Sequence, residues 1–193
     1  LRTRIVDGAE RAAARALWIL PASVLAIAAA ALWAPPWVGV IGIAGYLAGL
    51  TVAAVPLVKE ARAKPPHSYA TYSVAAGVSW LVVSLVWLGV LAAISPTWSA
   101  FSADLGVVVG PLAAGFAAQV LLGALSYLLP VVAGGGPVAV RAATAVLDRG
   151  AAWRISVISV GIAVWAPPVP SLVAVVGSAA ALVGLASFLP LLG

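Results

Sequence analysis

Long apolar stretches, separated by short breaks that hold charged residues, prolines or glycines, dominate this sequence. Only 8% of its 193 residues are charged, whereas soluble domains carry about 25%. A helix needs about 20 apolar residues to cross the hydrocarbon core of a bilayer, and open strands leave backbone groups unpaired in lipid. The pattern excludes a water-soluble globule and predicts an all-α, polytopic membrane bundle of about six transmembrane helices. The candidate spans are residues 16–33, 37–58, 71–94, 107–133, 151–166 and 171–192.

The basic residues lie on alternate connections between these spans. Four precede the first span, three follow the second and three precede the fifth, while the other connections contain none. By the positive-inside rule, both ends of this multi-pass chain are expected in the cytoplasm, with the cell membrane as its location. The net charge of +5 is explained by these flanking segments, so nucleic acid is not expected as a partner. The ten residues are Arg2, Arg4, Arg11, Arg15, Lys59, Arg62, Lys64, Arg141, Arg149 and Arg154.

Two local patterns predict helix boundaries. Asp7 and Glu10 have the spacing of an N-cap and its partner, so the first helix is expected to start near Gly8. A proline at position 137 and a glycine at 150 predict a short amphipathic helix over residues 137–149, lying on the inner membrane surface. Its apolar residues Val140, Ala143 and Leu147 are expected to face the membrane.

The residue types that usually carry chemistry are scarce. Cysteine and methionine are absent, which excludes disulfides, thiolate metal sites and iron–sulfur clusters. The sequence assigns no ionisable residue to the interior of a span, and His67 reads as an interfacial residue without ligand partners. We therefore predict no catalytic residue, metal ligand or cofactor within the chain. The acidic residues Asp7, Glu10, Glu60 and Asp148 are expected to be solvated partners of the cytoplasmic basic clusters, and Asp104 marks the outer entrance to span four.

Small residues repeat at helical spacing in spans two and four. Gly115, Gln119 and Gly123 recur every four residues in span four, and Gly45 and Gly49 form a GxxxG pair in span two. Such spacing predicts helix-packing faces. Gln119, the only carboxamide in the chain, is expected to form a hydrogen bond across to another helix. A contact with a cofactor or substrate is the alternative.

A short internal echo indicates a repeat. Residues 33–36 (WAPP) recur as residues 165–168, at what are expected to be two outer turns. The echo favours a repeat every four helices. The alternative is that Pro-Pro simply makes a good tight turn.

Residues 115–130 (GFAAQVLLGALSYLLP), with Gly-Gly-Gly-Pro at 134–137 and Asp-Arg-Gly at 148–150, resemble the membrane region of actinobacterial multicopper-oxidase-domain proteins. The opening residues 1–4 resemble the end of an earlier helix in those proteins, which look like copper nitrite reductases fused to a haem-copper-oxidase-like polytopic part. The resemblance implies a larger redox protein with copper or haem elsewhere, and it fits a four-helix repeat. No metal-ligating histidine of that family has a counterpart here, so no site residue is carried over.

The leading functional prediction is a scaffold domain without its own metal site. Because residue 1 is leucine and methionine is absent, we expect residues 1–193 to be one transmembrane domain of a longer chain. Its expected partners are the lipid bilayer, further transmembrane helices and cupredoxin domains of the same protein. Two alternatives stay open: a permease or channel-like subunit that works as a homo-oligomer, and a structural assembly subunit.

Overall fold

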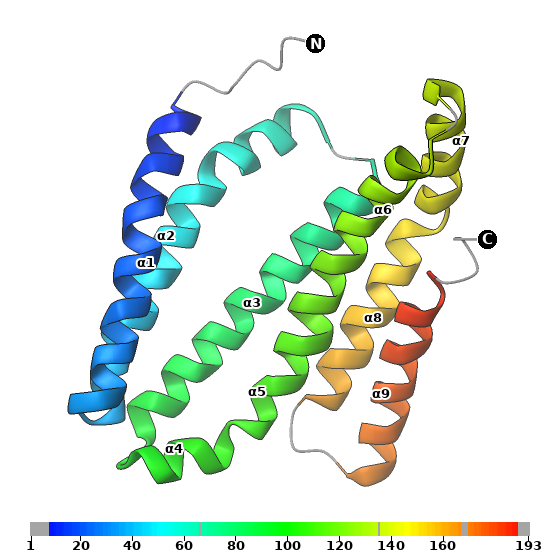
Figure 1. The fold of residues 1–193 in the computed structure, drawn as a ribbon. Helices are drawn as coiled ribbons and strands as arrows, with labels where there is room; N and C mark the ends of the chain where they lie inside the picture. The colour runs from blue at the N-terminus through cyan, green and yellow to red at the C-terminus, as the bar shows by residue number, and fades with distance from the viewer. Residues whose placement is uncertain (1–7, 66, 135, 167–169, 189–193) are drawn as a thin grey trace. The chain divides into compact units, whose positions relative to one another are not determined.

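The computed structural model describes residues 8–65, 67–134, 136–166 and 170–188, and within these ranges the chain forms helices and turns but no strand (Figure 1). The predicted all-α fold is confirmed. The helices are α1 (Ala9–Trp33), α2 (Pro36–Ala63), α3 (Tyr69–Ile94), α4 (Trp98–Asp104), α5 (Gly106–Gly110), the π-helical segment η1 (Pro111–Ala118), α6 (Gln119–Ala133), α7 (Gly136–Asp148), α8 (Ala151–Trp165) and α9 (Ser171–Ala186).

Four helices are long and apolar enough to cross a membrane. They are α1, α2, α3 and the continuous helix Gly106–Val132, which is built from α5, η1 and α6. Each holds 25 to 28 residues, and at about 1.5 Å per residue each exceeds the thickness of a hydrocarbon core. Helices α8 and α9 are apolar but have only 15 and 16 residues, so the count of six spans stays a prediction.

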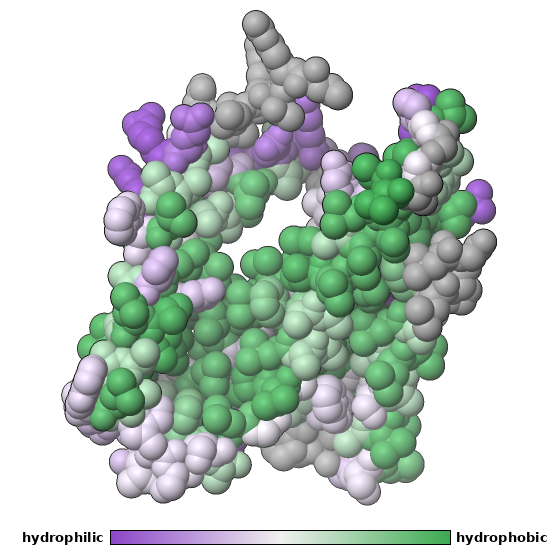
Figure 2. All heavy atoms as spheres, in the orientation of Figure 1, coloured by the Kyte–Doolittle hydropathy of each residue, from purple (hydrophilic) through white to green (hydrophobic). Residues whose placement is uncertain are grey.

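Large apolar side chains cover the outer surfaces of these helices. Leu17, Leu25 and Ile41 are each about 70% exposed, and Leu121 and Leu172 are also exposed. A soluble protein does not expose apolar surface on this scale. Figure 2 shows the hydrophobic colour over most of this face of the chain, with hydrophilic residues gathered near the start of α1, the end of α2 and along α7. These surfaces are consistent with contact with lipid.

The chain divides into two compact units. Unit 1 includes residues 8–65 and 85–105, and unit 2 includes residues 67–84 and 106–188 among those described. Helix α3 contributes its first part to unit 2 and its last part to unit 1.

Unit 1 is built on the hairpin of α1 and α2, which lie side by side (Figure 1). The turn between them is short, since α1 ends at Trp33 and α2 begins at Pro36. A proline suits the first position of a helix because the N–H of that residue has no partner within the helix. Trp98 of α4 closes the same end of the unit, since its indole N–H donates a hydrogen bond of 2.8 Å to the Ala34 carbonyl.

Helix α1 starts at Ala9, close to the expected Gly8. Gly8 itself occupies the N-cap position with φ of 88°, a left-handed conformation that glycine adopts without a steric penalty. The expected N-cap Asp7 lies outside the described residues.

In the echo of residues 33–36 and 165–168, Trp33 and Trp165 each end a helix. Residues 167 and 168 are not described, so the four-helix repeat stays a prediction.

Unit 2 has two buried apolar clusters. One joins Tyr69, Leu147, Ala151 and Phe188, and the other joins Ile158, Ile162 and Ala181 with Trp80 packed against it. The first cluster corrects the interpretation of α7. This helix spans almost the predicted range, but Leu147 is only 4% exposed, because it packs into the protein core instead of facing the membrane.

Candidate functional site

The stripe predicted in span four lies on the buried face of η1 and α6. Gln119 is fully buried, and Gly115 and Gly123 on the same face are buried as well. A methyl group placed on Gly115 would lie 2.7 Å from Trp80 Cγ, and one on Gly123 would lie 3.0 Å from the Ala70 carbonyl. Both neighbours belong to α3, so this face packs against the first part of α3.

The Gln119 side chain does not form the expected hydrogen bond to another helix. Its Oε1 and Nε2 atoms are buried and have no hydrogen-bond partner among the described residues. The link between the helices runs through the backbone instead, because Ser73 Oγ of α3 donates a hydrogen bond of 2.7 Å to the Gln119 carbonyl. The prediction was wrong about which atoms make the link, since the small serine lies close enough to reach the main chain.

Trp80 connects three helices around this buried face. It starts on α3, packs over Gly115 of η1, and its indole N–H donates a long hydrogen bond of 3.4 Å to Ser159 Oγ of α8. Only a residue without a side chain at position 115 leaves room for the indole ring. The π-helical turn begins at Pro111, which cannot donate a helix hydrogen bond, and widened turns of this kind often mark functional positions.

Gln119 of α6, Ser73 and Trp80 of α3, and Ser159 of α8 all carry neutral hydrogen-bonding groups. A carboxamide offers two donor hydrogens and an acceptor oxygen, and a hydroxyl offers one of each kind. The Ser73 hydroxyl and the Trp80 indole N–H already donate hydrogen bonds, to the Gln119 carbonyl and to Ser159 Oγ, so the Gln119 carboxamide is the group left without a partner among the described residues. A buried carboxamide without partners is costly, which makes Gln119 the candidate site of unit 2.

A second polar cluster, centred on Arg154, was missed in the sequence. We had assigned Arg154 to the basic segment before span five, but it lies one turn inside α8 and is 4% exposed. Arg154 is thus buried within a helix and is not a solvated flanking cation. Arg154 Nη2 donates hydrogen bonds to the Leu147 carbonyl and, at 2.9 Å, to the Arg149 carbonyl. These are carbonyls at the C-terminal end of α7, where a cation is favourable.

The Arg154 guanidinium also lies over an aromatic ring. Its Cζ is 4.3 Å from the ring centroid of Tyr69, which is 1% exposed and stacks on Phe188 with 5.9 Å between centroids. This geometry is that of a cation–π contact. The guanidinium is thus held by two carbonyls of the chain before α8 and by the first residue of α3.

Asp148 is also placed differently from the prediction. It is half-buried, and its Oδ1 accepts a hydrogen bond of 2.6 Å from the backbone N–H of Tyr69. A carboxylate at this position satisfies one of the free N–H groups at the start of α3. The cap comes from a residue 79 positions along the chain, which no local pattern reveals.

The remaining predicted residues lie elsewhere. In unit 1, a methyl group on Gly45 would lie 2.7 Å from Ser23 Oγ, and one on Gly49 would lie 2.8 Å from Leu20 Cδ2, so both glycines lie against α1. His67 is exposed two residues before α3, and Asp104 is exposed at the end of α4. Within the described ranges, the histidines and acidic residues form no group of three that could hold a metal ion.

Comparisons of the chain with protein-family models, with curated proteins and with solved structures gave no match. The resemblance of residues 115–130 to multicopper-oxidase-domain proteins therefore stays a prediction.

Proposed function

We propose that this chain is a membrane-embedded scaffold domain, which anchors and orients other parts of a larger protein. The observation that carries the proposal is the backbone-to-backbone packing of helix pairs. A methyl group on Gly161 of α8 would lie 2.7 Å from the Gly177 carbonyl and from the Ala181 N atom, both in α9. Such close approach fixes one helix against another, as a scaffold requires.

The polar contacts of unit 2 support the same function. Arg154 and Asp148 both use their charges to satisfy backbone groups at helix ends. These contacts tie the start of α3, the end of α7 and the start of α8 together. Charged groups that bind helix ends in this way stabilise the packing of the helices.

The larger protein is proposed to be a copper or haem-copper-like redox protein of the cell membrane, with both ends of this segment in the cytoplasm. The redox assignment depends on the resemblance of residues 115–130. The proposed orientation depends on the basic residues near the start of α1, at the end of α2 and around α7.

The test compares the purified chain with the longer protein encoded by the reading frame around residues 1–193. In lipid nanodiscs the chain alone should unfold cooperatively on heating, as measured by the fluorescence of its eight tryptophans. Elemental analysis and absorption spectroscopy should detect neither copper nor haem bound to it. The longer protein should bind one of them. Stoichiometric metal or haem on the chain alone would contradict the scaffold, whereas a longer frame without a redox domain would contradict only the redox assignment.

Gln119 favours a second candidate function, a permease or channel-like subunit. A buried carboxamide without partners in the middle of a spanning helix is the kind of group that a polar solute contacts in a transporter. This function predicts solute flux in liposomes that contain the chain alone, with loss of flux in Gln119→Leu. Flux that is unchanged in Gln119→Leu would remove the observation that favours this candidate.

A further inference from the structure

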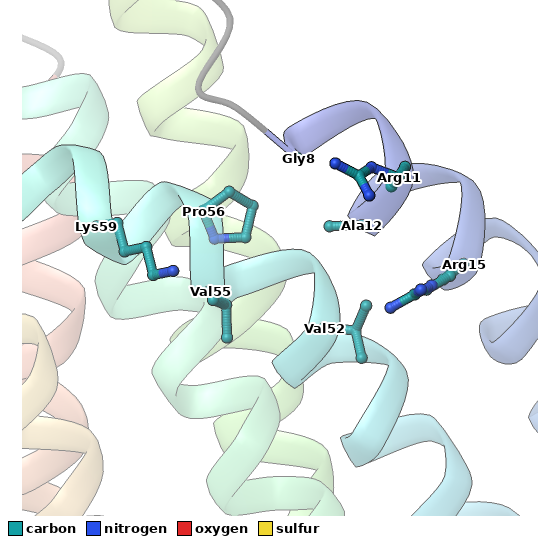
Figure 3. A pocket seen from close by; sticks show the side chains of 8 residues that line it. All are labelled: Gly8, Arg11, Ala12, Arg15, Val52, Val55, Pro56 and Lys59. Atoms are coloured by element: carbon teal, nitrogen blue, oxygen red, sulfur yellow. The ribbon is translucent and has the colours of Figure 1, made fainter.

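A pocket opens between α1 and α2 at the end of unit 1 where α1 begins and α2 ends. Its volume is about 350 Å³. Figure 3 shows Arg11 and Arg15 on α1 and Lys59 on α2 pointing into the space between the two helices. Gly8, Ala12, Val52, Val55 and Pro56 complete the lining.

Three positive charges therefore converge on one pocket. The carboxylates of Glu10 and Glu60 lie on the same two helices but are not part of the lining. Like charges gathered in this way repel one another unless an anion lies between them. The start of α1 adds to the positive potential, because the N-terminal end of a helix carries a partial positive charge.

The rest of the lining is apolar. Val52, Val55 and Pro56 precede Lys59 on α2, and Figure 3 shows the Arg15 side chain close to Val52. A free inorganic anion would gain no binding energy from this apolar surface. A phospholipid headgroup places its phosphate among the cations and its acyl chains along the apolar helices.

We propose that this pocket binds the phosphate headgroup of an anionic phospholipid. Arg11, Arg15 and Lys59 hold the phosphate, and the valines of α2 contact the first carbons of the acyl chains. The volume accommodates a phosphate group together with several waters, each of which occupies about 30 Å³ in the liquid. This binding does not depend on the scaffold function, because it concerns only the hairpin of unit 1.

The experiment measures lipid retention by native mass spectrometry of the full chain in detergent. The probes are phosphatidylglycerol, zwitterionic phosphatidylcholine and inorganic phosphate. The pocket variant is Arg11→Gln with Arg15→Gln. The matched control is Arg62→Gln with Lys64→Gln, which removes the same charge from the end of α2 without touching the lining.

The wild-type chain should retain phosphatidylglycerol in preference to phosphatidylcholine and inorganic phosphate. Each removed pocket cation should weaken phosphatidylglycerol binding about fivefold at low salt, and Lys59→Gln should show the single-charge effect. The control should bind like the wild type. All of these side chains are exposed, and unchanged circular dichroism will verify that the variants fold.

Three results would overturn the proposal. An equal loss in the control variant would mean that general surface charge attracts the lipid. Wild-type binding in the folded pocket variant would mean that the lipid binds elsewhere. Inorganic phosphate bound as tightly as phosphatidylglycerol would show that the apolar lining has no role and that the ligand is a soluble phosphate.

Discussion

Arg154 shows how one charged side chain can hold three helices. Its guanidinium bonds two carbonyls before α8 and covers the ring of Tyr69. Removing it leaves the carbonyl of the buried Leu147 without this donor, and hydrogen bonds that involve a charged group contribute about 1.5–3 kcal/mol each.

We expect Arg154→Met to lower the free energy of unfolding by about 2–3 kcal/mol. Methionine matches the aliphatic part of the arginine side chain, so much of the packed volume is kept and the loss reports chiefly the interactions of the guanidinium. The measurement is unfolding in mixed micelles, followed by tryptophan fluorescence. Arg149→Met, at an exposed position, is the control and should change little. Equal stability of the two variants would contradict the role of Arg154.

Asp148 gives a second prediction at the same scale. Because its carboxylate caps α3 through the N–H of Tyr69, Asp148→Ala should destabilise the chain by about 1 kcal/mol, while Asp148→Asn should retain most of the stability. Asp104→Ala, at an exposed carboxylate, serves as the control in the same unfolding assay. A similar loss in the alanine and asparagine variants would show that charge matters here and that capping does not.

Gln119 gives a prediction of opposite sign. Since its buried side-chain atoms have no partner among the described residues, Gln119→Met should raise the free energy of unfolding by about 1 kcal/mol, as it removes the desolvation cost. Thermal unfolding of the two proteins in the same detergent measures the difference. A decrease would indicate that a water or ligand satisfies the carboxamide, which would strengthen the permease alternative.

At the scale of the elements, glycines determine where the backbones of two helices come into contact. The pair α8 and α9 is the closest example, with Gly161 against the backbone of α9. Helices of this length have little stability of their own in water, and in lipid their association depends on such packing.

We expect Gly161→Ala to destabilise this pair by about 1–3 kcal/mol, because the added methyl group meets backbone atoms that cannot rotate away. Gly89→Ala is the matched control. There a methyl group would lie 3.7 Å from Ile43 Cγ2, an ordinary contact, and the higher helix propensity of alanine should leave stability unchanged or raise it by up to about 1 kcal/mol. Equal stability of the two variants would show that helix propensity, and not packing, decides the effect at position 161.

The elements themselves could be predicted well from the sequence. Apolar runs and their proline or glycine ends place α2 at residues 36–63 against the expected 37–58, and α7 at 136–148 against 137–149. These features are local, because span length and helix stops depend on neighbouring residues. The orientation of α7 could not be predicted, since Leu147 is buried by Tyr69 and Phe188, which lie far away in the sequence.

The same limit applies to the candidate sites. The spacing of Gly115, Gln119 and Gly123 indicated a common face, but it could not tell that Ser73 would reach the backbone of Gln119. Arg154 resembled a flanking cation because basic residues normally stop at the membrane surface. Its burial depends on carbonyls and an aromatic ring that only the folded chain brings together.

At the scale of the whole molecule, the proposed orientation can be tested directly because the chain contains no cysteine. Lys64→Cys and Ser99→Cys place single thiols at exposed positions after α2 and within α4. In intact cells a membrane-impermeant maleimide should label Ser99→Cys at once and Lys64→Cys only after permeabilisation. Labelling in the opposite order would reverse the orientation, and labelling of both in intact cells would contradict the span between them.

The cap that Asp148 supplies to Tyr69 has a consequence for biosynthesis. The ribosome completes α3 long before it reaches position 148, since 79 residues separate donor and acceptor. Until residue 148 is synthesised, this N–H lacks its carboxylate cap, so we expect the start of α3 to be held in place only after α7 has formed. A nascent chain halted before α7 is then expected to be cut by proteases near the start of α3 more readily than the finished protein.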